Sequence, residues 1–356
     1  MQRAGGDGDG DGMAGHARQD MAGTVRRWSV LPLARSASPA KTEQRAPTRR
    51  THGSTEERMT SDHTADTRVT VLGLGRMGSA ITERYLRAGY PTTVWNRTPG
   101  RAAHLDELGA GRAESLAGAI TAGDLIVLSH IDTAGVAALL ETVPDAMTGR
   151  TVLNVSTGRP DDARALATWI AARGGRFLDG AILGMPATLG TPDALIPYSG
   201  SVEAAAEHRA AIAELGAATY LGTDAGLAAL HDMAVLAGMY GMFGGFFQAT
   251  AMLGGEPTTA HRLTAEFLVP WLRALLDVLP TLAAELDADE FAPTFASIAE
   301  MGAVLETIRG VSREQGVPTD LLDPMQRLLA AGVQHGLGAD NFTRAVRVVR
   351  DHTVPA

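Results

Sequence analysis

The sequence has no cysteine, and Lys41 is its single lysine. The absence of cysteine excludes disulfides, thiolate metal sites and cysteine nucleophiles, and it fits the reducing cytoplasm in which we expect the protein to act. Because no lysine follows Lys41, no lysine amine is available for catalysis in the rest of the chain. The sequence shows no run of about 18 apolar residues, so we expect no membrane span. We also expect no metal site.

The charge balance limits the class of partner. The 356 residues carry a formal net charge of -9, whereas a nucleic-acid surface needs clustered positive charge, so we expect no nucleic-acid partner. Hydrophobic residues make up 45% and charged residues 20%, which is ordinary for a soluble globular protein with a sizeable core. The length suits one large domain or two ordinary ones.

Residues 1–67 differ in composition from the rest of the chain. They open with a GDGDGDG run, are rich in Gly, Arg, Ser, Thr and Asp, and show no sustained hydrophobic period. Such a segment buries too little apolar surface to offset its ordering entropy, so we predict a disordered or non-native extension. Arg26 and Arg27 faintly resemble a twin-arginine export signal, but the apolar run after them is short and interrupted by Pro32. Met59 opens a stretch that reads like an ordinary protein start, so residues 1–58 are candidates for a non-native segment.

From residue 68 to residue 222 the pattern alternates between strand and helix. A helix is expected over 77–87, a second is expected to begin at Thr98 and Pro99 as cap and first helical residue, and a third at Pro160. The expected strands are 69–72, 92–95, 125–128, 151–154, 176–178 and 218–221. Strands that alternate with helices predict a Rossmann-type α/β domain with a parallel sheet covered on both faces.

After residue 222 the period becomes helical throughout. A long interdomain helix is expected over 223–253, about 45 Å in length, with Thr223 and Asp224 able to cap it. Residues 254–356 read as an all-α domain with breaks near Gly254, Pro280, Pro293, 316–318 and 336–338. About 100 following residues do not cover so long an apolar helix, so we expect a second subunit to do so.

A glycine motif follows the first strand and opens the first helix. In it, the first glycine permits a tight turn, the second lets the backbone approach a pyrophosphate, and the third lets helix and strand pack closely. The alternative, a glycine-rich turn, is disfavoured because the strand before and the helix after are both in register. The predicted cofactor-binding residues here are Gly73, Leu74, Gly75, Arg76, Met77 and Gly78.

The end of the second strand predicts which dinucleotide binds. Asn96, Arg97 and Thr98 stand about 20 residues after the motif, where an NAD enzyme places an acidic residue for the ribose hydroxyls. A carboxylate would repel a 2′-phosphate, whereas a guanidinium binds it bidentately. The alternative is a solvated arginine in a helix-capping turn. We predict NADPH as the cofactor.

The long helix carries one carboxylate in a nearly all-apolar segment. Asp232 is the only acidic residue between Asp224 and Glu256, and burial without a partner would raise its pKa. Tyr240 lies eight positions on, about 80° round the helix, so both side chains can flank one pocket. The alternative is an aspartate on an exposed edge of the helix. We interpret His231 as structural.

These residues resemble the imine reductases and reductive aminases, relatives of the β-hydroxyacid dehydrogenases. The resemblance covers about 68–349 and rests on VLGLGRMG, VWNRTP, LNVSTGRPDDAR, FLDGAILGMP, YSGS, GLAALHDMAVLAGMYGMFGGF and SREQGVPTDLL. It implies a domain-swapped homodimer whose active sites draw on both subunits. It also implies that Asp232 pairs with a protonated imine and supplies or relays a proton, and that Tyr240 lines the substrate. Met185 and Trp271 are candidate substrate-pocket residues, each with a structural alternative.

The expected activity is NADPH-dependent reduction of cyclic imines or iminium ions to amines, with reductive amination of ketones as an extension. One alternative is a β-hydroxyacid-dehydrogenase-type oxidoreductase, but its helix lysine is missing and residues 227–255 contain no arginine to bind a carboxylate. Another is a non-catalytic NADP-binding protein, which Asp232 disfavours. We interpret Asp179 as holding its loop. His130, at the end of a strand, is a candidate for contact with the nicotinamide or the substrate.

Overall fold

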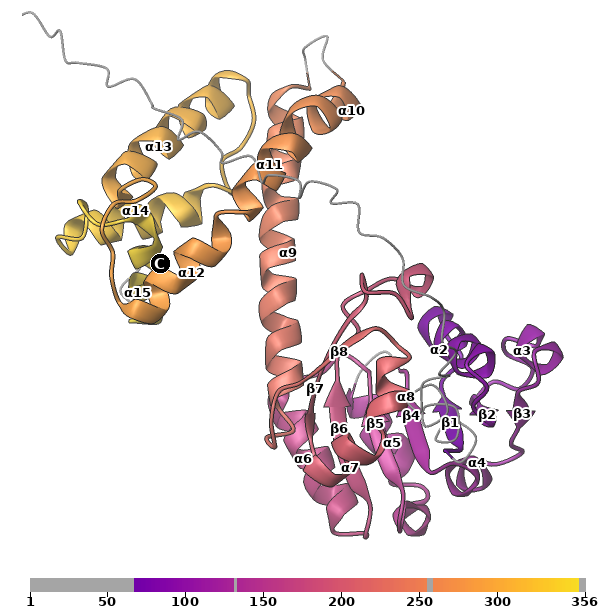
Figure 1. The fold of residues 1–356 in the computed structure, drawn as a ribbon. Helices are drawn as coiled ribbons and strands as arrows, with labels where there is room; N and C mark the ends of the chain where they lie inside the picture. Colours follow the sequence, from indigo (N-terminus) through magenta and orange to yellow (C-terminus); the bar gives the residue numbers. More distant parts are fainter. Residues whose placement is uncertain (1–66, 131–132, 255–258, 352–356) are drawn as a thin grey trace, which may run out of the picture. The chain divides into compact units, whose positions relative to one another are not determined.

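A computed structural model describes residues 67–130, 133–254 and 259–351. The predictions for the extension up to residue 66 therefore lie outside the described residues. Eight strands form one sheet in the order β3-β2-β1-β4-β5-β6-β7-β8 (Figure 1). The strands are β1 (Val69–Leu72), β2 (Thr92–Trp95), β3 (Gly111–Arg112), β4 (Leu125–Leu128), β5 (Thr151–Asn154), β6 (Arg176–Gly180), β7 (Leu195–Gly200) and β8 (Ala217–Tyr220).

The sheet is not fully parallel, which corrects the expectation from the sequence. Strands β1 to β6 are parallel, but β7 pairs with β6 in the antiparallel sense and β8 runs parallel to β7. Two of these strands, β3 and β7, were not predicted. A two-residue strand carries no detectable period, and β7 contains Pro197 and Ser199, which weaken its apolar signal.

Helices cover both faces of the sheet, as predicted. One core cluster joins β1, β2, β4 and β5 to α2, α3, α7 and α8, and the other joins the opposite face of these strands to α4, α5 and α6. Neighbouring residues such as Leu153 and Val152 belong to different clusters because strand side chains alternate between faces. The helices are α2 (Arg76–Arg87), α3 (His104–Glu107), α4 (Leu116–Ala122), α5 (Thr133–Leu140), α6 (Pro160–Ala171), α7 (Val202–Glu207) and α8 (Arg209–Ala213), with 3-10 turns at η1 (Pro144–Met147) and η2 (Pro186–Thr188).

One predicted helix start within residues 68–222 is wrong. The helix α3 begins at His104, not at Thr98 and Pro99, because the intervening turn places Gly100 and Ala102 at positive φ, which interrupts a right-handed helix. The start at Pro160 is confirmed, with Arg159 as the cap and two aspartates in the first turn. The residues 96–99 are consequently left as loop at the end of β2.

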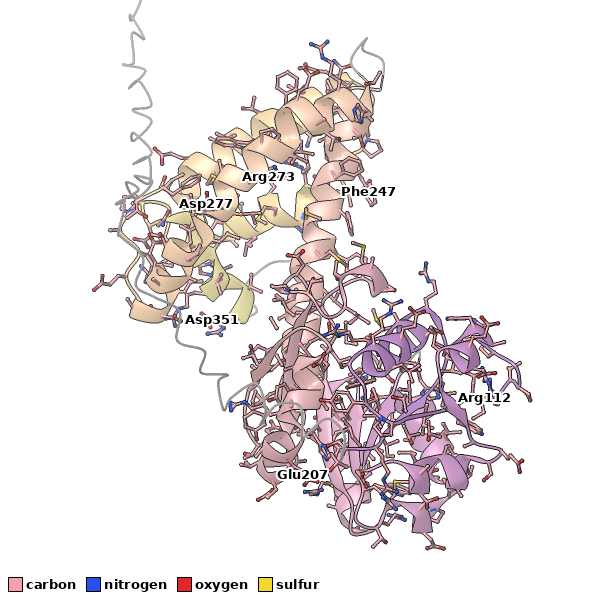
Figure 2. The ribbon with its side chains drawn as sticks, turned by 45° about the vertical axis from the view of Figure 1, so that its right-hand side comes forward. Arg112, Glu207, Phe247, Arg273, Asp277 and Asp351 are labelled. Carbon is pink, nitrogen blue, oxygen red and sulfur yellow. The ribbon has the colours of Figure 1, made fainter. Side chains whose placement is uncertain are left out.

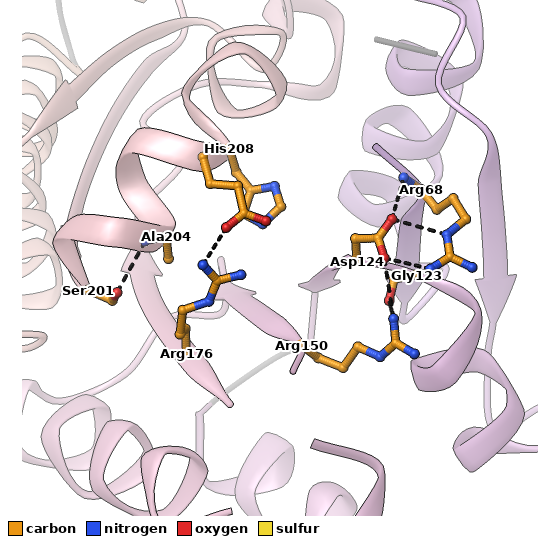
Figure 3. Close-up of polar contacts among 9 residues, drawn as sticks. Arg68, Gly123, Asp124, Arg150, Arg176, Ser201, Ala204 and His208 are labelled. Atoms are coloured by element: carbon orange, nitrogen blue, oxygen red, sulfur yellow. Dashed lines mark hydrogen bonds and ion pairs between the residues drawn. The ribbon is translucent and has the colours of Figure 1, made fainter. Parts of the chain in front are cut away.

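Ion pairs join the residues that precede several strands at the amino edge of the sheet, opposite the edge at which the glycine motif lies. Arg68 before β1 donates to Asp124 before β4 at 2.6 Å, and Arg150 before β5 reaches the same carboxylate at 3.3 Å (Figure 3). The pKa of Asp124 is lowered, chiefly by the hydrogen bond from Arg68. Arg176 at the start of β6 pairs with Glu207 in the same region (Figure 3).

The remainder is helical, as predicted. The helices are α9 (Leu227–Met252), α10 (Ala260–Arg262), a π-helical turn η3 (Leu263–Leu268), α11 (Val269–Leu276), α12 (Leu279–Ala288), α13 (Ile298–Glu314), α14 (Asp323–Gln334), the turn η4 (Phe342–Arg344) and α15 (Ala345–Arg350). The gaps between them match the predicted breaks. Helix α9 begins at Leu227 with Gly226 as its cap, so the predicted cap at Thr223 and Asp224 is wrong. Instead, Asp224 binds Arg164 at 2.8 Å and accepts from the Gly226 N–H.

Two helical stretches, Leu227–Met252 and Ala260–Ala288, are long and apolar enough to cross a membrane by length and composition alone. Neither stretch is an unbroken apolar run, since polar residues such as Asp232 and Gln248 interrupt the first one, so the expectation of no membrane span stays a prediction. Only 17% and 0% of the residues in these two windows are buried, so both stretches present exposed apolar surface. Gln248, near the carboxyl end of α9, donates to Ser312 Oγ on α13 at 3.2 Å and so links the two helices.

Candidate active site

A cavity of about 910 Å³ lies at the carboxyl ends of β1, β2 and β4, the edge at which parallel α/β sheets bind ligands. Eight of the nine residues predicted to bind the cofactor line it, and the ninth, Gly78, lies behind them. The lining residues are Gly73, Leu74, Gly75, Arg76, Met77, Trp95, Asn96, Arg97, Thr98, Arg101, Ser129, His130, Gly135, Ala138, Leu139 and Thr142.

The glycines leave room where a dinucleotide needs it. A Cβ at Gly75 would meet nothing within 4 Å, so the backbone there is open to the cavity. By contrast, a Cβ at Gly78 would lie 1.9 Å from the Gly73 carbonyl oxygen, so that glycine serves the packing of α2 against β1. Gly75 caps α2 without a side-chain hydrogen bond, which leaves the first N–H groups of a twelve-residue helix available to an anion.

Among the described residues, three arginines and no acidic residue line this cavity. Arg97 is exposed and, among the described residues, makes no hydrogen bond or ion pair, so its guanidinium is available to a ligand. Arg101 donates to the Leu74 carbonyl at 3.3 Å, which places a second cation beside the glycine motif. Asn96 accepts from the Leu74 N–H at 3.0 Å and donates to the Thr98 carbonyl at 3.1 Å. Asn96 therefore joins the glycine motif to the loop after β2. The arginines of this lining suit a dinucleotide with an additional phosphate.

Asp232 lies on the second turn of α9 and is buried, with 8% of its surface exposed. Burial raises its pKa above the ordinary value for an aspartate. The side chain is therefore not on an exposed helix edge, which decides between the two alternatives left by the sequence. The neighbouring His231 is exposed and its Nδ1 lies 2.7 Å from the Leu227 carbonyl oxygen one turn back, which fits the structural interpretation.

The three residues predicted to line the substrate pocket are largely exposed in this chain. Tyr240, Met185 and Trp271 are 70%, 66% and 61% exposed, and none of them lines the cavity at the glycine motif. Phe247 (Figure 2) lies seven positions after Tyr240 and therefore on the same side of α9, and it is 58% exposed.

Other polar residues at the same sheet edge were missed or undervalued. Asn154 ends β5 and is fully buried, and its Nδ2 donates to Asp179 at 2.8 Å. Asp179 is 3% exposed and contacts the start of α9, so it does more than hold its own loop. Ser129 and His130 line the cavity after β4. Position at a strand's carboxyl end was the signal available in the sequence for all four.

Known proteins match both parts of the chain. Residues 224–351 match the model of the C-terminal domain of NADPH-dependent reductive aminase-like proteins, and residues 68–222 match the NAD binding domain of 6-phosphogluconate dehydrogenase. The NADPH-dependent reductive aminase of Aspergillus oryzae is 34% identical over 279 residues, which span 78% of this chain and 95% of that protein. The chain belongs to the reductive aminase and imine reductase family.

Solved structures of this family have the same fold. The reductive aminase of Aspergillus terreus, in complex with NADPH4, cyclohexanone and allyl amine, is 38% identical with a TM-score of 0.75, covering 80% of this chain and 99% of that one. The imine reductase of Myxococcus stipitatus, in complex with NADP+, is 30% identical with a TM-score of 0.75, covering 79% and 99%. The predicted family and the order of a Rossmann-type domain before a helical domain are thereby confirmed.

Proposed function

We propose that the protein reduces C=N bonds with NADPH, that Asp232 is the charged group facing the substrate nitrogen, and that Arg97 selects NADPH over NADH. The enzyme is an NADPH-dependent oxidoreductase of imines, and its relatives extend this chemistry to reductive amination. The observation that carries the assignment of the site is a buried carboxylate on α9, in a chain with no lysine among its described residues.

The reaction requires a hydride at carbon and a proton at nitrogen. When bound, NADPH supplies the hydride from its nicotinamide C4 to the imine carbon as the C=N π bond breaks. Asp232 pairs with the protonated nitrogen and holds the substrate in place, and for a neutral imine it supplies or relays the proton. A raised pKa suits this role because a group whose pKa lies closer to the working pH both gives and accepts a proton readily.

The chain's own groups hold the cofactor in this proposal. The free N–H groups at the start of α2 bind the pyrophosphate beside the open backbone of Gly75. Arg97, with Arg76 and Arg101 beside it in the same lining, binds the 2′-phosphate, and Thr98 and Asn96 shape that loop. The absence of cysteine suits a reducing compartment, and we place the enzyme in the cytoplasm as part of this proposal.

A consumption assay with a simple five- or six-membered cyclic imine tests the activity. We expect NADPH absorbance to fall only when the imine is present, and the amine product to appear in equal amount. A β-hydroxyacid offered with NADP+ serves as the control for the dehydrogenase alternative. NADPH binding without turnover of any cyclic imine would instead favour a non-catalytic NADP-binding protein.

We also propose that the protein is a homodimer in which a second copy covers α9 and completes the substrate pocket. Cβ atoms at Gly238, Gly241, Gly244 and Gly245 would meet nothing within 4 Å. Each glycine costs a helix about 1 kcal/mol relative to alanine. Because nothing in the described chain packs against these four positions, no contact within it offsets this cost. Exposed Tyr240 and Phe247 extend the same open surface. A swapped arrangement brings Met185 and Trp271 to a shared pocket in this proposal.

Light scattering is expected to give about twice the chain mass of 37.2 kDa over the micromolar range. Gly241→Glu puts a charge on the open surface of α9 and should shift the population toward monomer, with activity falling in parallel. Asp145→Glu, at an exposed position on η1 away from α9, is the matched control and should leave the mass unchanged. A stable monomer with full activity would contradict the shared pocket.

A further inference from the structure

Three buried polar residues stand side by side at the carboxyl edge of the sheet. Asn154 on β5 is the register partner of Asp179 on β6, and Asp179 is the register partner of Ser199 on β7. All three are at most 3% exposed. Buried polar groups are tolerated when they are hydrogen-bonded, and this row is bonded across the strands and to the helix that follows.

The row holds the first turn of α9. The Ala228 N–H donates to Ser199 Oγ at 3.0 Å, and the next N–H, that of Ala229, bonds the Asp179 carboxyl. Ser199 Oγ in turn donates to the Ala225 carbonyl at 3.1 Å. The first N–H groups of a helix have no partner within it, so these contacts fix where α9 starts and how it is rotated. Asp232 lies one turn beyond Ala228 and Ala229, on the same buried face.

Asp179 also places a second carboxyl near Asp232. Burial is the largest influence on Asp179 and raises its pKa to about 7, while the hydrogen bond from Asn154 and the Ala229 N–H oppose this rise and the charge of Asp232 adds to it. Asp232 is the titratable group that acts on Asp179 from α9, whereas β5 and β7 present the non-titrating Asn154 and Ser199. The charge of Asp232 is the smallest of these influences, so the burial of Asp179 in the row accounts for most of the rise.

We propose that Asp179 is a positioning residue for Asp232: it anchors the first turn of α9 to the sheet, and its burial keeps its own carboxyl from adding a second negative charge to the site. The kinetic part of this inference rests on the proposed role of Asp232 in imine reduction. A single charge matches a single iminium cation, and the anchored turn keeps that charge at a fixed place.

The dependence of stability on pH tests the charge state of Asp179 without an activity assay. Because the pKa of Asp179 rises from 3.8 to about 7 on folding, the folded chain binds more protons than the unfolded chain between these values. The unfolding equilibrium constant of the wild type, divided by that of Asp179→Asn, should therefore rise about 10-fold per pH unit from pH 5 and level off above pH 7. Urea titrations of the full chain give this ratio, and one that is flat with pH would overturn the charge assignment.

Two further variants separate charge from anchoring. Ser199→Ala removes the neighbouring anchor and no charge, so its unfolding equilibrium should keep the wild-type dependence on pH. Asp232→Asn leaves Asp179 buried in place and removes only the smallest influence that raises its pKa, so its unfolding equilibrium should keep most of the wild-type dependence on pH. This last variant keeps the proposal testable if Asp179→Asn does not fold, because an unfolding equilibrium that no longer depends on pH between pH 5 and pH 7 would overturn the burial of an uncharged Asp179.

Kinetics with a preformed, permanently charged cyclic iminium complete the test. Above pH 7 the wild-type pair gains its second charge and should bind the cation more tightly, so KM should fall about 10-fold between pH 6 and pH 8. Asp179→Asn should show no such fall, whereas Ser199→Ala should retain it. Both variants should lower kcat by about 10-fold through misplacement of Asp232. Equal pH dependence of KM in Asp179→Asn and wild type would overturn the proposal. Absence of wild-type turnover would instead count against the proposed function, with the urea result unaffected.

Discussion

Replacing Asp232 with alanine is expected to lower kcat for a neutral cyclic imine by about 100-fold or more, the range of positioned acid–base groups. Asp232→Asn retains the size and one acceptor but removes the charge, so it should resemble alanine if the electrostatic role is correct. NADPH affinity should barely change, because Asp232 does not line the cavity at the glycine motif. Steady-state kinetics and fluorescence titration of NADPH measure the two effects separately.

A comparison of two substrates separates proton transfer by Asp232 from its pairing with a cation. A permanently charged iminium needs no proton, so the loss in Asp232→Asn should be smaller with it than with a neutral imine. Tyr240→Phe should alter substrate range or stereochemical outcome more than rate, because Tyr240 is an exposed side chain with no assigned proton-transfer role. Asp145→Asn, at an exposed position, is the matched control for a lost carboxylate. A near-wild-type rate for Asp232→Asn with the neutral imine would refute the assigned role.

Replacing Arg97 with alanine is expected to weaken NADPH binding by about 10- to 100-fold, the value of one or two charge-assisted hydrogen bonds of about 1.5–3 kcal/mol. NADH lacks the 2′-phosphate, so its affinity should change little. The guanidinium has no other partner among the described residues, so the substitution leaves no buried group unpaired. Fluorescence titration with both dinucleotides gives the ratio of dissociation constants.

A matched arginine on the same domain controls for net charge. Arg87 is on the last turn of α2, away from the cavity, and pairs with Glu83 on the helix surface. Arg87→Ala should leave both affinities unchanged, because an exposed pair of this kind contributes little. Raising the salt concentration should weaken NADPH binding to the wild type more than to Arg97→Ala. Equal losses for NADPH and NADH in Arg97→Ala would remove Arg97 from the phosphate site.

Local patterns in the sequence were enough for the cofactor motif and for most of the sheet. The glycine spacing of Gly73, Gly75 and Gly78 imposes a strand, a tight turn and a helix that are all contiguous in the chain. The helix start at Pro160 was also predicted, because capping chemistry acts within a few residues. The same reasoning failed at Thr98 and Pro99, where a cap signal was present but Gly100 and Ala102 adopt positive φ.

The reversal of β7 and β8 was decided by tertiary structure, since a strand's own residues do not specify the direction of its neighbour. Burial of Asp232 and its coupling to Asp179 likewise depend on groups 53 residues apart that meet only after β6 and α9 pack. The sequence by itself determined the family, the cofactor loop and the carboxylate on α9, because each is written in a short contiguous segment. The tertiary structure alone decided that this carboxylate and Asp179 are both buried and lie near each other, because burial and proximity arise from packing between distant segments.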